Sequence, residues 1–378
     1  MHSDASGGGV DRYFWELNRG LQRTATDLKT RKFFFEKGAG TVQESPEELS
    51  IGRADLPLPR RLLLLRNRIL KTPDFDPYRF VLASHFSLYA LPLVPEFSKL
   101  AHVIHFHGPW AQESSLHGQG KVRVLLKKAV EQLVYRTATS FITDSNAFRK
   151  LLVSEYAVPL EKVQAILPAV DIFRFQRADR LTSRAVLGWP RGRRIILCVR
   201  RLVERMGIEG LVAAFASIVA RHSDVCLFIA GQGPLRGELE CRIASLGLAD
   251  RVRLLGYLPD ATLPAAYQAA DISIVPSTSL EGFGLTTLES LACGTPVLVT
   301  PVGGLPEAIQ ALSPTCILAG AESDQIANGL DAYLSGDLEV PTAAKCVEYV
   351  RQNFTWDRAA KQVLAVYEDA FRTKHGGR

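Results

Sequence analysis

The chain has 378 residues, of which 47% are hydrophobic, so it exceeds what one core usually organises and can fill two. Residues 1–175 hold 24 basic and 18 acidic side chains, whereas residues 176–378 hold 21 of each, so the net charge of +6 belongs to the first part. No zinc-finger, recognition-helix or aromatic RNA-binding signature accompanies this charge. That argues against a nucleic-acid partner and favours an anionic membrane face or a lipid-phosphate acceptor, with ordinary solvated side chains as the alternative.

The six cysteines form no Cys-x-x-Cys or Cys/His ligand pair, so we expect reduced thiols and a cytoplasmic protein. No apolar run reaches the roughly eighteen residues that a membrane span needs, and the polar start MHSDASGGG differs from a signal peptide. Peripheral contact at the inner face of a membrane stays open.

A glycine triplet opens the first predicted helix. Gly8 and Gly9 precede residues 10–17, whose apolar side chains recur with helical spacing, and such a loop fits either anion binding or a flexible terminus. Residues 38–60 are rich in Gly, Pro and acids and predict a loop. Residues 60–71 (RRLLLLRNRILK) predict a basic, apolar helix that either packs on a sheet or lies at an anionic membrane.

Two histidines end a later predicted strand, residues 102–107 (HVIHFH). His105 and His107 project to one face, because side chains alternate along a strand. A zinc site would need a third ligand, and no Cys or His-Glu-x-x-His pattern supplies one, so we expect no metal and a structural role for His105. Residues 121–136 then predict an amphipathic helix, and Ser145 lies in a predicted helix cap.

The second half begins with an unbroken apolar strand at residues 194–199 (RIILCV), which delivers Arg201 and Arg205 at its carboxyl end. Ligands of open parallel sheets bind outside that end. Another buried strand, 225–230, leads into Gly231 in the pattern Gly-x-Gly-x-x-x-Gly. This spacing differs from the dinucleotide fingerprint Gly-x-Gly-x-x-Gly, and the following strand ends without an acid for a ribose.

Residues 277–307 (STSLEGFGLTTLESLACGTPVLVTPVGGLPE) hold the sharpest pattern. A Gly-Phe-Gly loop at 282–284 opens a helix, so its glycines allow close approach of a ligand and the first helical N–H groups attract phosphate. Glu281 and Glu289 flank this loop. Taken alone, these carboxylates would be read as a charge that offsets the helix dipole and a solvated surface charge.

The Glu-x7-Glu pattern around Gly-Phe-Gly, followed by ACGTPV at 292–297 and GGLPE at 303–307, resembles the nucleotide-sugar site of glycosyltransferase family 4, group 1 type. The resemblance implies an α/β GT-B fold, in which two Rossmann-like doubly wound domains face a central cleft. We expect an acceptor-side domain at 1–178, a nucleotide-sugar-binding domain at 179–354 and a helix at 355–378 that crosses back. In the family an apolar strand precedes the first glycine loop, whereas only six polar or small residues precede Gly7 here. Either the true start lies upstream, or the first domain lacks its first strand, and we expect that strand to be missing from this sequence.

By the same resemblance, the protein would be a retaining, metal-independent hexosyltransferase that needs no cofactor. It would move a hexosyl group from a nucleoside-diphosphate sugar to a hydroxyl of a glycan or lipid-linked acceptor, in cell-surface polysaccharide or glycolipid synthesis. His107 and Glu281 would orient the sugar, while Arg201 and Arg205 would stabilise the departing diphosphate. Arg205 takes the place of a family lysine, for which this chain has Met206.

The remaining implied contacts are loop residues that would bind substrate, with Glu289 on the ribose: Gly8, Gly9, Gly231, Tyr257, Phe283, Gly284, Leu285, Thr286 and Glu289. Two other classes stay open. A nucleotide-sugar epimerase or hydrolase can use the same architecture, and so can a non-catalytic sugar-nucleotide sensor.

Overall fold

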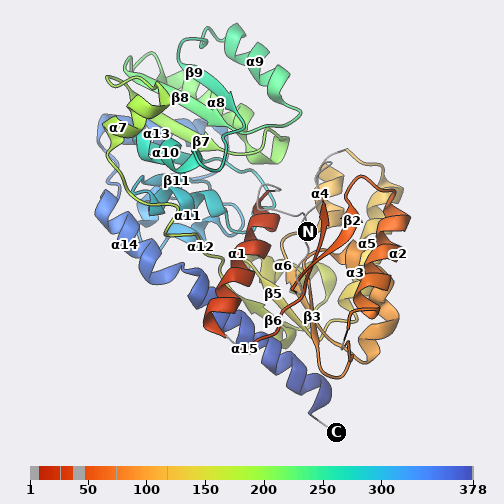
Figure 1. Cartoon of the computed structure of the whole chain (residues 1–378). Coiled ribbons are helices and arrows are strands. Elements are labelled where there is room, and N and C mark those ends of the chain that lie inside the picture. The colour runs from red at the N-terminus through yellow and green to blue at the C-terminus, as the bar shows by residue number, and fades with distance from the viewer. Residues whose placement is uncertain (1–7, 26, 37–46, 74, 117, 377–378) are drawn as a thin grey trace. The chain divides into compact units, whose positions relative to one another are not determined.

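The computed structural model describes residues 8–25, 27–36, 47–73, 75–116 and 118–376 (Figure 1). The chain forms two compact α/β units, of which unit 1 comprises residues 1–168 and 356–378 and unit 2 comprises residues 169–355. The first boundary therefore lies ten residues before the expected 178/179, and the second lies one residue after the expected 354/355.

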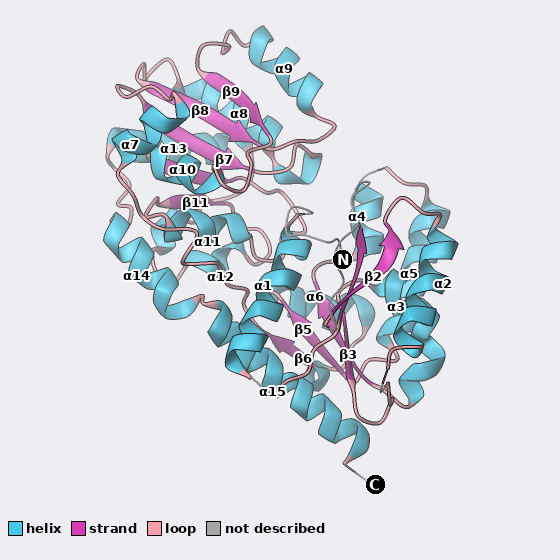
Figure 2. Cartoon of the chain, in the orientation of Figure 1, coloured by secondary structure: helices cyan, strands magenta, loops and turns pink. Residues whose placement is uncertain are grey.

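The main sheet of unit 1 has four parallel strands in the order β3-β4-β5-β6 (Figure 2). The strands are β3 (Val81–Ser84), β4 (Ala101–Phe106), β5 (Ser140–Thr143) and β6 (Val163–Ala165). Every residue of β4 is buried, as expected for a parallel strand that is covered on both faces. In register, Ile104 lies opposite Phe141 and His105 opposite Ile142, so His105 sits in the middle of the sheet.

Two further strands, β1 (Lys32–Glu36) and β2 (Glu48–Arg53), pair in parallel as a separate small sheet. The prediction of a loop over residues 38–60 is therefore wrong for β2 and for the start of α2, while residues 37–46 lie outside the described part. The helices of unit 1 are α1 (Gly9–Thr24), α2 (Leu58–Leu70), α3 (Ser87–Ala90), α4 (Trp110–Leu116), α5 (Lys121–Tyr135), α6 (Asn146–Tyr156) and α15 (Trp356–His375), with 3-10 turns η2 (Leu91–Ser98) and η3 (Leu160–Lys162).

Helix α15, at the end of the chain, packs beside α1 and over β3, β4 and β5, so it belongs to unit 1 (Figure 1). Gly20 makes this approach possible, because a Cβ atom there would lie 2.8 Å from the carbonyl oxygen of Trp356. The ring of Tyr13 meets that of Trp356 edge-on at 5.4 Å, and Arg23 donates to Asp357 at 2.8 Å. The two helices thus cover one face of the four-stranded sheet.

Unit 2 has five parallel strands in the order β11-β10-β7-β8-β9. They are β7 (Arg194–Val199), β8 (Val225–Ala230), β9 (Val252–Gly256), β10 (Ile272–Val275) and β11 (Val297–Val299). The chain builds outward from β7 to β9, then returns to the other side of β7 with β10. The strand order therefore reverses between β7 and β10, and in open α/β sheets ligands bind at the carboxyl ends of strands beside such a switch point.

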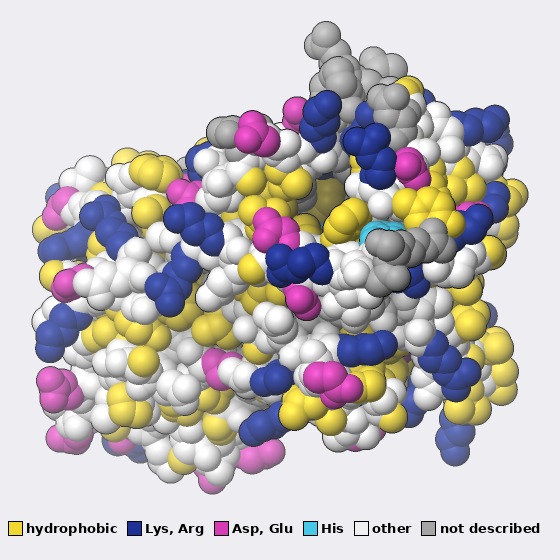
Figure 3. Space-filling view, turned by 90° about the horizontal axis from the view of Figure 1, so that it is seen from below, with side chains coloured by type: hydrophobic (Ala, Val, Ile, Leu, Met, Phe, Trp, Pro, Cys, Tyr) yellow, Lys and Arg dark blue, Asp and Glu magenta, His cyan; other side chains and the backbone are white. Residues whose placement is uncertain are grey.

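The helices of unit 2 are α7 (Arg180–Leu187), α8 (Ile208–Ile218), α9 (Arg236–Ser245), α10 (Leu263–Ala269), α11 (Leu285–Ala292), α12 (Leu305–Ile309), α13 (Ser323–Ser335) and α14 (Ala343–Asn353), with 3-10 turns η4 (Glu204–Met206) and η5 (Pro314–Cys316). On the face shown in Figure 3, basic side chains are spread among acidic and hydrophobic ones and form no single patch. This distribution does not single out that face as a nucleic-acid-binding surface.

Candidate functional site

The switch point of unit 2 holds a buried ion pair. Arg200 directly follows β7, and both Ser277 and Glu281 follow β10. The guanidinium of Arg200 donates to Glu281 and to Ser277, and the Ser277 hydroxyl donates to Glu281 at 2.9 Å. Arg200 and Glu281 are 9% and 8% exposed. Glu281 was predicted from the sequence as a site residue, but Arg200 was not. Two consecutive arginines follow β7, and only the conformation of the loop determines which of them is buried.

Glycines hold these loops against one another. At Gly231, after β8, a Cβ atom would lie 1.8 Å from the carbonyl oxygen of Arg200, and at Gly303, after β11, it would lie 1.9 Å from that of Glu281. Both have positive φ, 143° and 57°. The backbone of each glycine therefore touches a residue of the ion pair, and no side chain fits at either position. This contact fixes where the carboxyl ends of neighbouring strands lie.

Helix α11 begins beside the pair. Gly284 precedes it with φ 80°, and Leu285 is its first residue. The hydroxyl oxygens of Thr286 and Thr287, in the first turn, are buried and have no hydrogen-bond partner among the described residues. The first N–H groups of a helix lack intrahelical partners and carry partial positive charge. The Thr287 amide already donates to the Gly284 carbonyl oxygen at 2.8 Å. The two unpaired hydroxyls and the remaining amides at the start of the helix make this turn suited to an anionic oxygen-rich ligand such as phosphate.

Other residues predicted to bind the sugar donor lie in the loops that follow the strands of unit 2. Arg201 is exposed after β7, and no ion pair to it forms within the described residues. Arg205 is half-buried and donates to the carbonyl oxygen of Leu280 at 3.1 Å. Tyr257, after β9, is 51% exposed. Arg201 and Tyr257 thus stand at the carboxyl edge of the sheet and remain accessible to a ligand.

Two other predicted site residues, Phe283 and Glu289, are buried. Phe283 is 3% exposed and packs its ring 5.8 Å from that of Phe354. Glu289 is 2% exposed, and its carboxylate accepts a hydrogen bond from Tyr267 at 2.9 Å. Phe283 therefore offers a ligand its backbone and not its ring. A contact of Glu289 with a ribose stays a prediction.

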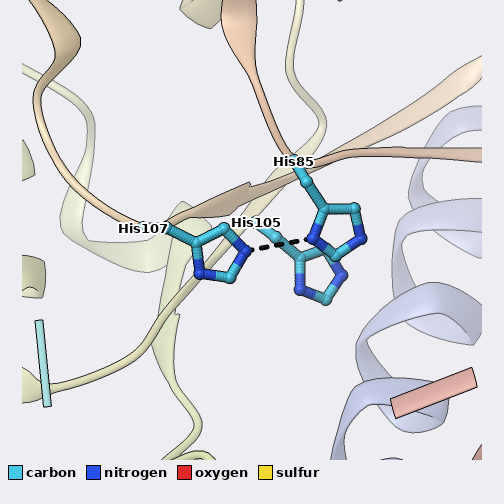
Figure 4. Close-up of side chains that lie close together, drawn as sticks. All are labelled: His85, His105 and His107. Atoms are coloured by element: carbon cyan, nitrogen blue, oxygen red, sulfur yellow. Dashed lines mark hydrogen bonds between the residues drawn. The ribbon is translucent and has the colours of Figure 1, made fainter. Parts of the chain in front are cut away.

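In unit 1, His107 lies just past the carboxyl end of β4. Its Nδ1 atom is 2.8 Å from the Asp144 carboxylate, and its Nε2 atom is 3.0 Å from Nδ1 of His85 (Figure 4). Sequence reasoning missed both partners. The available signal was positional, because His85, His107 and Asp144 directly follow β3, β4 and β5, and parallel neighbours end at the same edge. The expected Ser145 cap of α6 is confirmed, since its hydroxyl accepts from the Phe148 amide at 3.2 Å.

His105 has hydrogen-bond partners that fit the structural role expected from the sequence. Its Nε2 atom lies 2.7 Å from the hydroxyl of Tyr367 on α15, and its Nδ1 atom lies 3.3 Å from that of Tyr13 on α1. Burial, reinforced by the neighbouring imidazoles, lowers the pKa of His105 and of His85 well below the usual histidine range. Both rings are therefore neutral at neutral pH.

The glycine loop of unit 1 starts α1. Gly8 precedes the helix with φ 121°, Gly9 is its first residue, and both are exposed with open space where a Cβ atom would stand. Gly7 lies outside the described residues. The exposed first turn of this helix of 16 residues can meet an anion.

Helix α5 exposes an apolar stripe. Val122, Leu125 and Leu126 are 71%, 66% and 63% exposed, and Leu133 continues the stripe at 45%. The helix at residues 60–71 differs, because Leu65 and Ile69 of α2 are buried in the core and only Leu63 stands out. Among the described residues, no helix combines the length and apolar character required to cross a bilayer.

Comparison with known proteins accounts for both units. The family model for glycosyl transferases group 1 matches residues 179–353, and that for glycosyltransferase family 4 matches residues 7–174. The D-inositol 3-phosphate glycosyltransferase of Thermobispora bispora is 29% identical over 97% of this chain and 91% of its own length. An uncharacterized glycosyltransferase of Methanocaldococcus jannaschii is 33% identical over 64% of this chain, and that match spans 63% of the relative.

Solved structures share the fold at low identity. Sucrose-phosphate synthase from Thermosynechococcus elongatus superposes with a TM-score of 0.81 at 22% identity, covering 98% of this chain and 95% of that one. The Anabaena protein HepE in complex with UDP-glucose gives 0.76 at 18% identity, covering 97% of each chain. With both family models matched in chain order and a GT-B architecture along nearly its whole length, the chain belongs to the group 1 glycosyltransferases of family 4.

Proposed function

We propose that the protein transfers a hexosyl group, with retention of configuration, from a nucleoside-diphosphate sugar to a hydroxyl of a glycan or lipid-linked acceptor. The first turn of α11 carries this proposal, because its two buried, unpaired hydroxyls adjoin helix amides at the switch point of the sheet. The solved HepE complex with UDP-glucose supports a nucleotide-sugar donor. UDP-glucose is therefore the first donor to test.

The chemistry of donor cleavage explains the charges. When the bond between the sugar and the diphosphate breaks, negative charge grows on the phosphate oxygens. Fixed cations and N–H groups that already point at those oxygens stabilise this charge, each by about 3 kcal/mol by analogy with other preorganised donors. We assign this task to Arg201, Arg205 and the first turn of α11. The transfer itself would use no cofactor and no metal ion.

Glu281 is assigned to the orientation of the sugar. Its Oε2 atom accepts from both Arg200 and Ser277, so the carboxylate is held in place and its charge is balanced. A carboxylate held in this way suits a fixed hydrogen-bond acceptor better than a nucleophile, which needs an unbalanced charge to attack carbon. His107 is proposed to contact the sugar as well, with Asp144 fixing the orientation of its ring.

The decisive experiment combines binding and transfer. A thermal-shift panel of UDP-, GDP- and ADP-glucose should show stabilisation by one nucleotide class, because a ligand that binds only the native state raises its stability. Radiolabelled donor should then yield labelled glycan or lipid, and NMR of the anomeric proton should show retained configuration. The Arg201→Ala variant should lose transfer, while Arg242→Gln, an exposed arginine on α9, should keep it. Transfer by Arg201→Ala at the rate of the native protein would refute the donor site.

The same assay separates the alternatives. Free sugar or an epimer, formed without a labelled acceptor, would identify a hydrolase or epimerase instead. Binding of a nucleotide sugar with no turnover on any acceptor would identify a sensor.

We also propose that unit 1 contacts an anionic membrane from the cytoplasmic side, which would bring a lipid-linked acceptor within reach. The observation is the exposed stripe of α5, because Val122, Leu125 and Leu126 alternate with the exposed cations Lys121 and Arg123. A helix with outward apolar residues between basic ones fits the boundary between lipid headgroups and acyl chains.

A further inference from the structure

Three histidines of unit 1 form a cluster with the composition of a metal site. One ring nitrogen from each of His85, His105 and His107 lies within 4.8 Å of those of the other two. Figure 4 shows the rings of His85 and His107 facing each other along their hydrogen bond, with His105 beside them. The rings are close to parallel, at 8° for His85 with His107 and 20° for His85 with His105.

The hydrogen-bond partners of His107 and His105 outside the cluster determine which ring nitrogen of each histidine is available to bind a metal ion. His107 turns Nδ1 to the Asp144 carboxylate, which leaves Nε2 toward the cluster. His105 has its shorter hydrogen bond, 2.7 Å, between Nε2 and Tyr367, which leaves Nδ1 with the longer contact of 3.3 Å to Tyr13. Metal-bound histidines nearly always donate their second N–H group to an oxygen in this manner, because the bond fixes the tautomer and the ring orientation.

We propose that His85, His105 and His107 bind a divalent transition-metal ion, with Zn²⁺ as the preferred one. Neutral imidazole suits Zn²⁺ and its neighbours in the first transition row, whereas Mg²⁺ and Ca²⁺ prefer oxygen ligands. Nδ1 of His85, Nδ1 of His105 and Nε2 of His107 would supply three ligands. The fourth position of a tetrahedral site would hold water or a small anion.

The movement that binding would require differs between the pairs of rings. Zn–N bonds of about 2.1 Å at tetrahedral angles place ligand nitrogens about 3.4 Å apart. The nitrogens of His85 and His107 are already 3.0 Å apart, so the ion would replace the hydrogen bond after an opening of a few tenths of an ångström. The ring of His85 is stacked on that of His105, with centroids 4.3 Å apart, and the three ligand atoms lie within 4.8 Å of one another, so a ring must also turn before their nitrogens can point at one ion. Because His105 is the most enclosed of the three, at 1% exposure, the rings of His85 and His107 would make these adjustments.

Occupancy has a functional consequence that rests on the proposed function. A metal ion would take up Nε2 of His107, which is the ring atom that the transfer reaction would turn toward the sugar. Zn²⁺ is therefore expected to inhibit transfer, and the metal is not a participant in it. Metal binding itself does not depend on the transfer activity, so the two ideas can fail separately.

The test uses the full chain without a polyhistidine tag. Co²⁺ should give the visible absorption of a tetrahedral site, and Zn²⁺ should displace it at one ion per chain. His85→Gln should weaken binding by more than about 100-fold, because a three-nitrogen site becomes a two-nitrogen site. Asp144→Asn should weaken it by about 10-fold to 100-fold through the orientation of His107. His222→Gln, which removes a histidine of unit 2, should bind as the native protein does.

Two results would overturn the proposal. One is an absence of Co²⁺ absorption together with no Zn²⁺-dependent rise in the melting temperature of the native chain, a readout that needs no folded variant. The other is equal metal affinity of the native protein and folded His85→Gln. If Zn²⁺ binds as expected but transfer continues unchanged, the metal site stands and the assignment of His107 to the sugar fails.

Discussion

Arg200 and Glu281 form a buried ion pair between residues that lie 81 positions apart in the sequence. The pair bridges the loops after β7 and β10, the two neighbouring strands between which the strand order of the sheet in unit 2 reverses. Ser277 completes it by donating to the same carboxylate. The ion pair therefore joins the two sides of the proposed donor site and positions the residues on either side of it.

Replacing one residue of the Arg200–Glu281 pair should lower the unfolding free energy much more than replacing both. Glu281→Leu leaves the Arg200 charge buried without its counter-ion, and breaking such a pair costs about 3 kcal/mol or more of unfolding free energy. The double variant Arg200→Met with Glu281→Leu should recover much of that loss, because no unpaired charge remains. Urea denaturation of the native protein, Arg200→Met, Glu281→Leu and the double variant measures this coupling.

Glu240→Gln serves as the control, because Glu240 and Arg236 form a half-exposed pair on α9. Its loss should change the unfolding free energy by less than about 1 kcal/mol. Additive effects of the two buried substitutions would show that the pair does not couple the loops.

The strands of unit 2 could be predicted from sequence nearly to the residue. Buried parallel strands are unbroken apolar runs, and 194–199 and 225–230 are such runs bounded by polar residues and glycine. The small sheet of unit 1 was missed because β2 (ELSIGR) mixes polar and apolar residues and only Ile51 is buried. Its stability comes from its partner β1, which local sequence does not reveal.

The candidate site divides in the same way. Motif residues such as Glu281 and Gly231 could be identified by the resemblance to glycosyltransferase family 4, because the motifs of that family hold glycine and charge at set positions. Arg200 and His85 could not, since both depend on which strands lie side by side. The catalytic roles of Arg201, Arg205 and His107 stay predictions.

Gly303→Ala adds only one methyl group but should strongly lower both the stability of unit 2 and its affinity for the nucleotide sugar. Its φ of 57° already costs an alanine about 1 kcal/mol, and the added Cβ atom would overlap the carbonyl oxygen of Glu281 at 1.9 Å. The loop after β11 must then move, with a large fall in melting temperature and in nucleotide-sugar affinity.

Gly188→Ala is the matched comparison. Gly188 has nearly the same φ, 63°, but open space around it, so it isolates the conformational cost alone. It should lose about 1 kcal/mol and keep native affinity. Equal losses in the two variants would mean that the contact of Gly303 with Glu281 is not tight.

Unit 1 should lose stability as the pH falls through about 6.5. Burial lowers the pKa of His85, His102 and His105, in the case of His102 to about 3. Below the ordinary histidine value the unfolded chain binds protons that the native state refuses, so the unfolding free energy falls with the pH. Each such group contributes at most about 1.4 kcal/mol per pH unit.

Urea unfolding at pH 7.5, 6.5 and 5.5 checks this dependence. Three of the four tryptophans, Trp15, Trp110 and Trp356, belong to unit 1, so fluorescence reports mainly on it. His102→Gln should reduce the slope of unfolding free energy against pH by the equivalent of about one proton. If that slope were unchanged in His102→Gln, the lowered pKa of His102 would be contradicted.

The stripe of α5 should carry vesicle binding. Leu125→Glu combined with Leu126→Glu places charge on the outward face, so binding to vesicles that contain phosphatidylglycerol should fall at least tenfold, a cost of about 1.4 kcal/mol. Binding by the native protein should also weaken as salt rises, because Lys121 and Arg123 act through screened charge. Sedimentation with vesicles measures both effects.

Val186→Glu provides the control, since Val186 is 74% exposed on α7 of unit 2 but lies outside the stripe. Equal sedimentation of all three proteins would remove α5 from consideration as a membrane contact.

Replacing Thr286 by valine should weaken binding of the nucleotide sugar without lowering the stability of the protein. Its buried hydroxyl has no partner among the described residues, so Thr286→Val removes a desolvated polar group and should leave stability equal or slightly higher. If a phosphate oxygen of the donor uses that hydroxyl, affinity for the nucleotide sugar should fall about tenfold. Thr295 is the counterpart, because its buried hydroxyl donates to the carbonyl oxygen of Tyr267 at 2.7 Å. Thr295→Val should therefore lower stability. Calorimetric titration with UDP-glucose and thermal melts separate the two cases, and native affinity in a stabilised Thr286→Val protein would show that the hydroxyl faces no ligand.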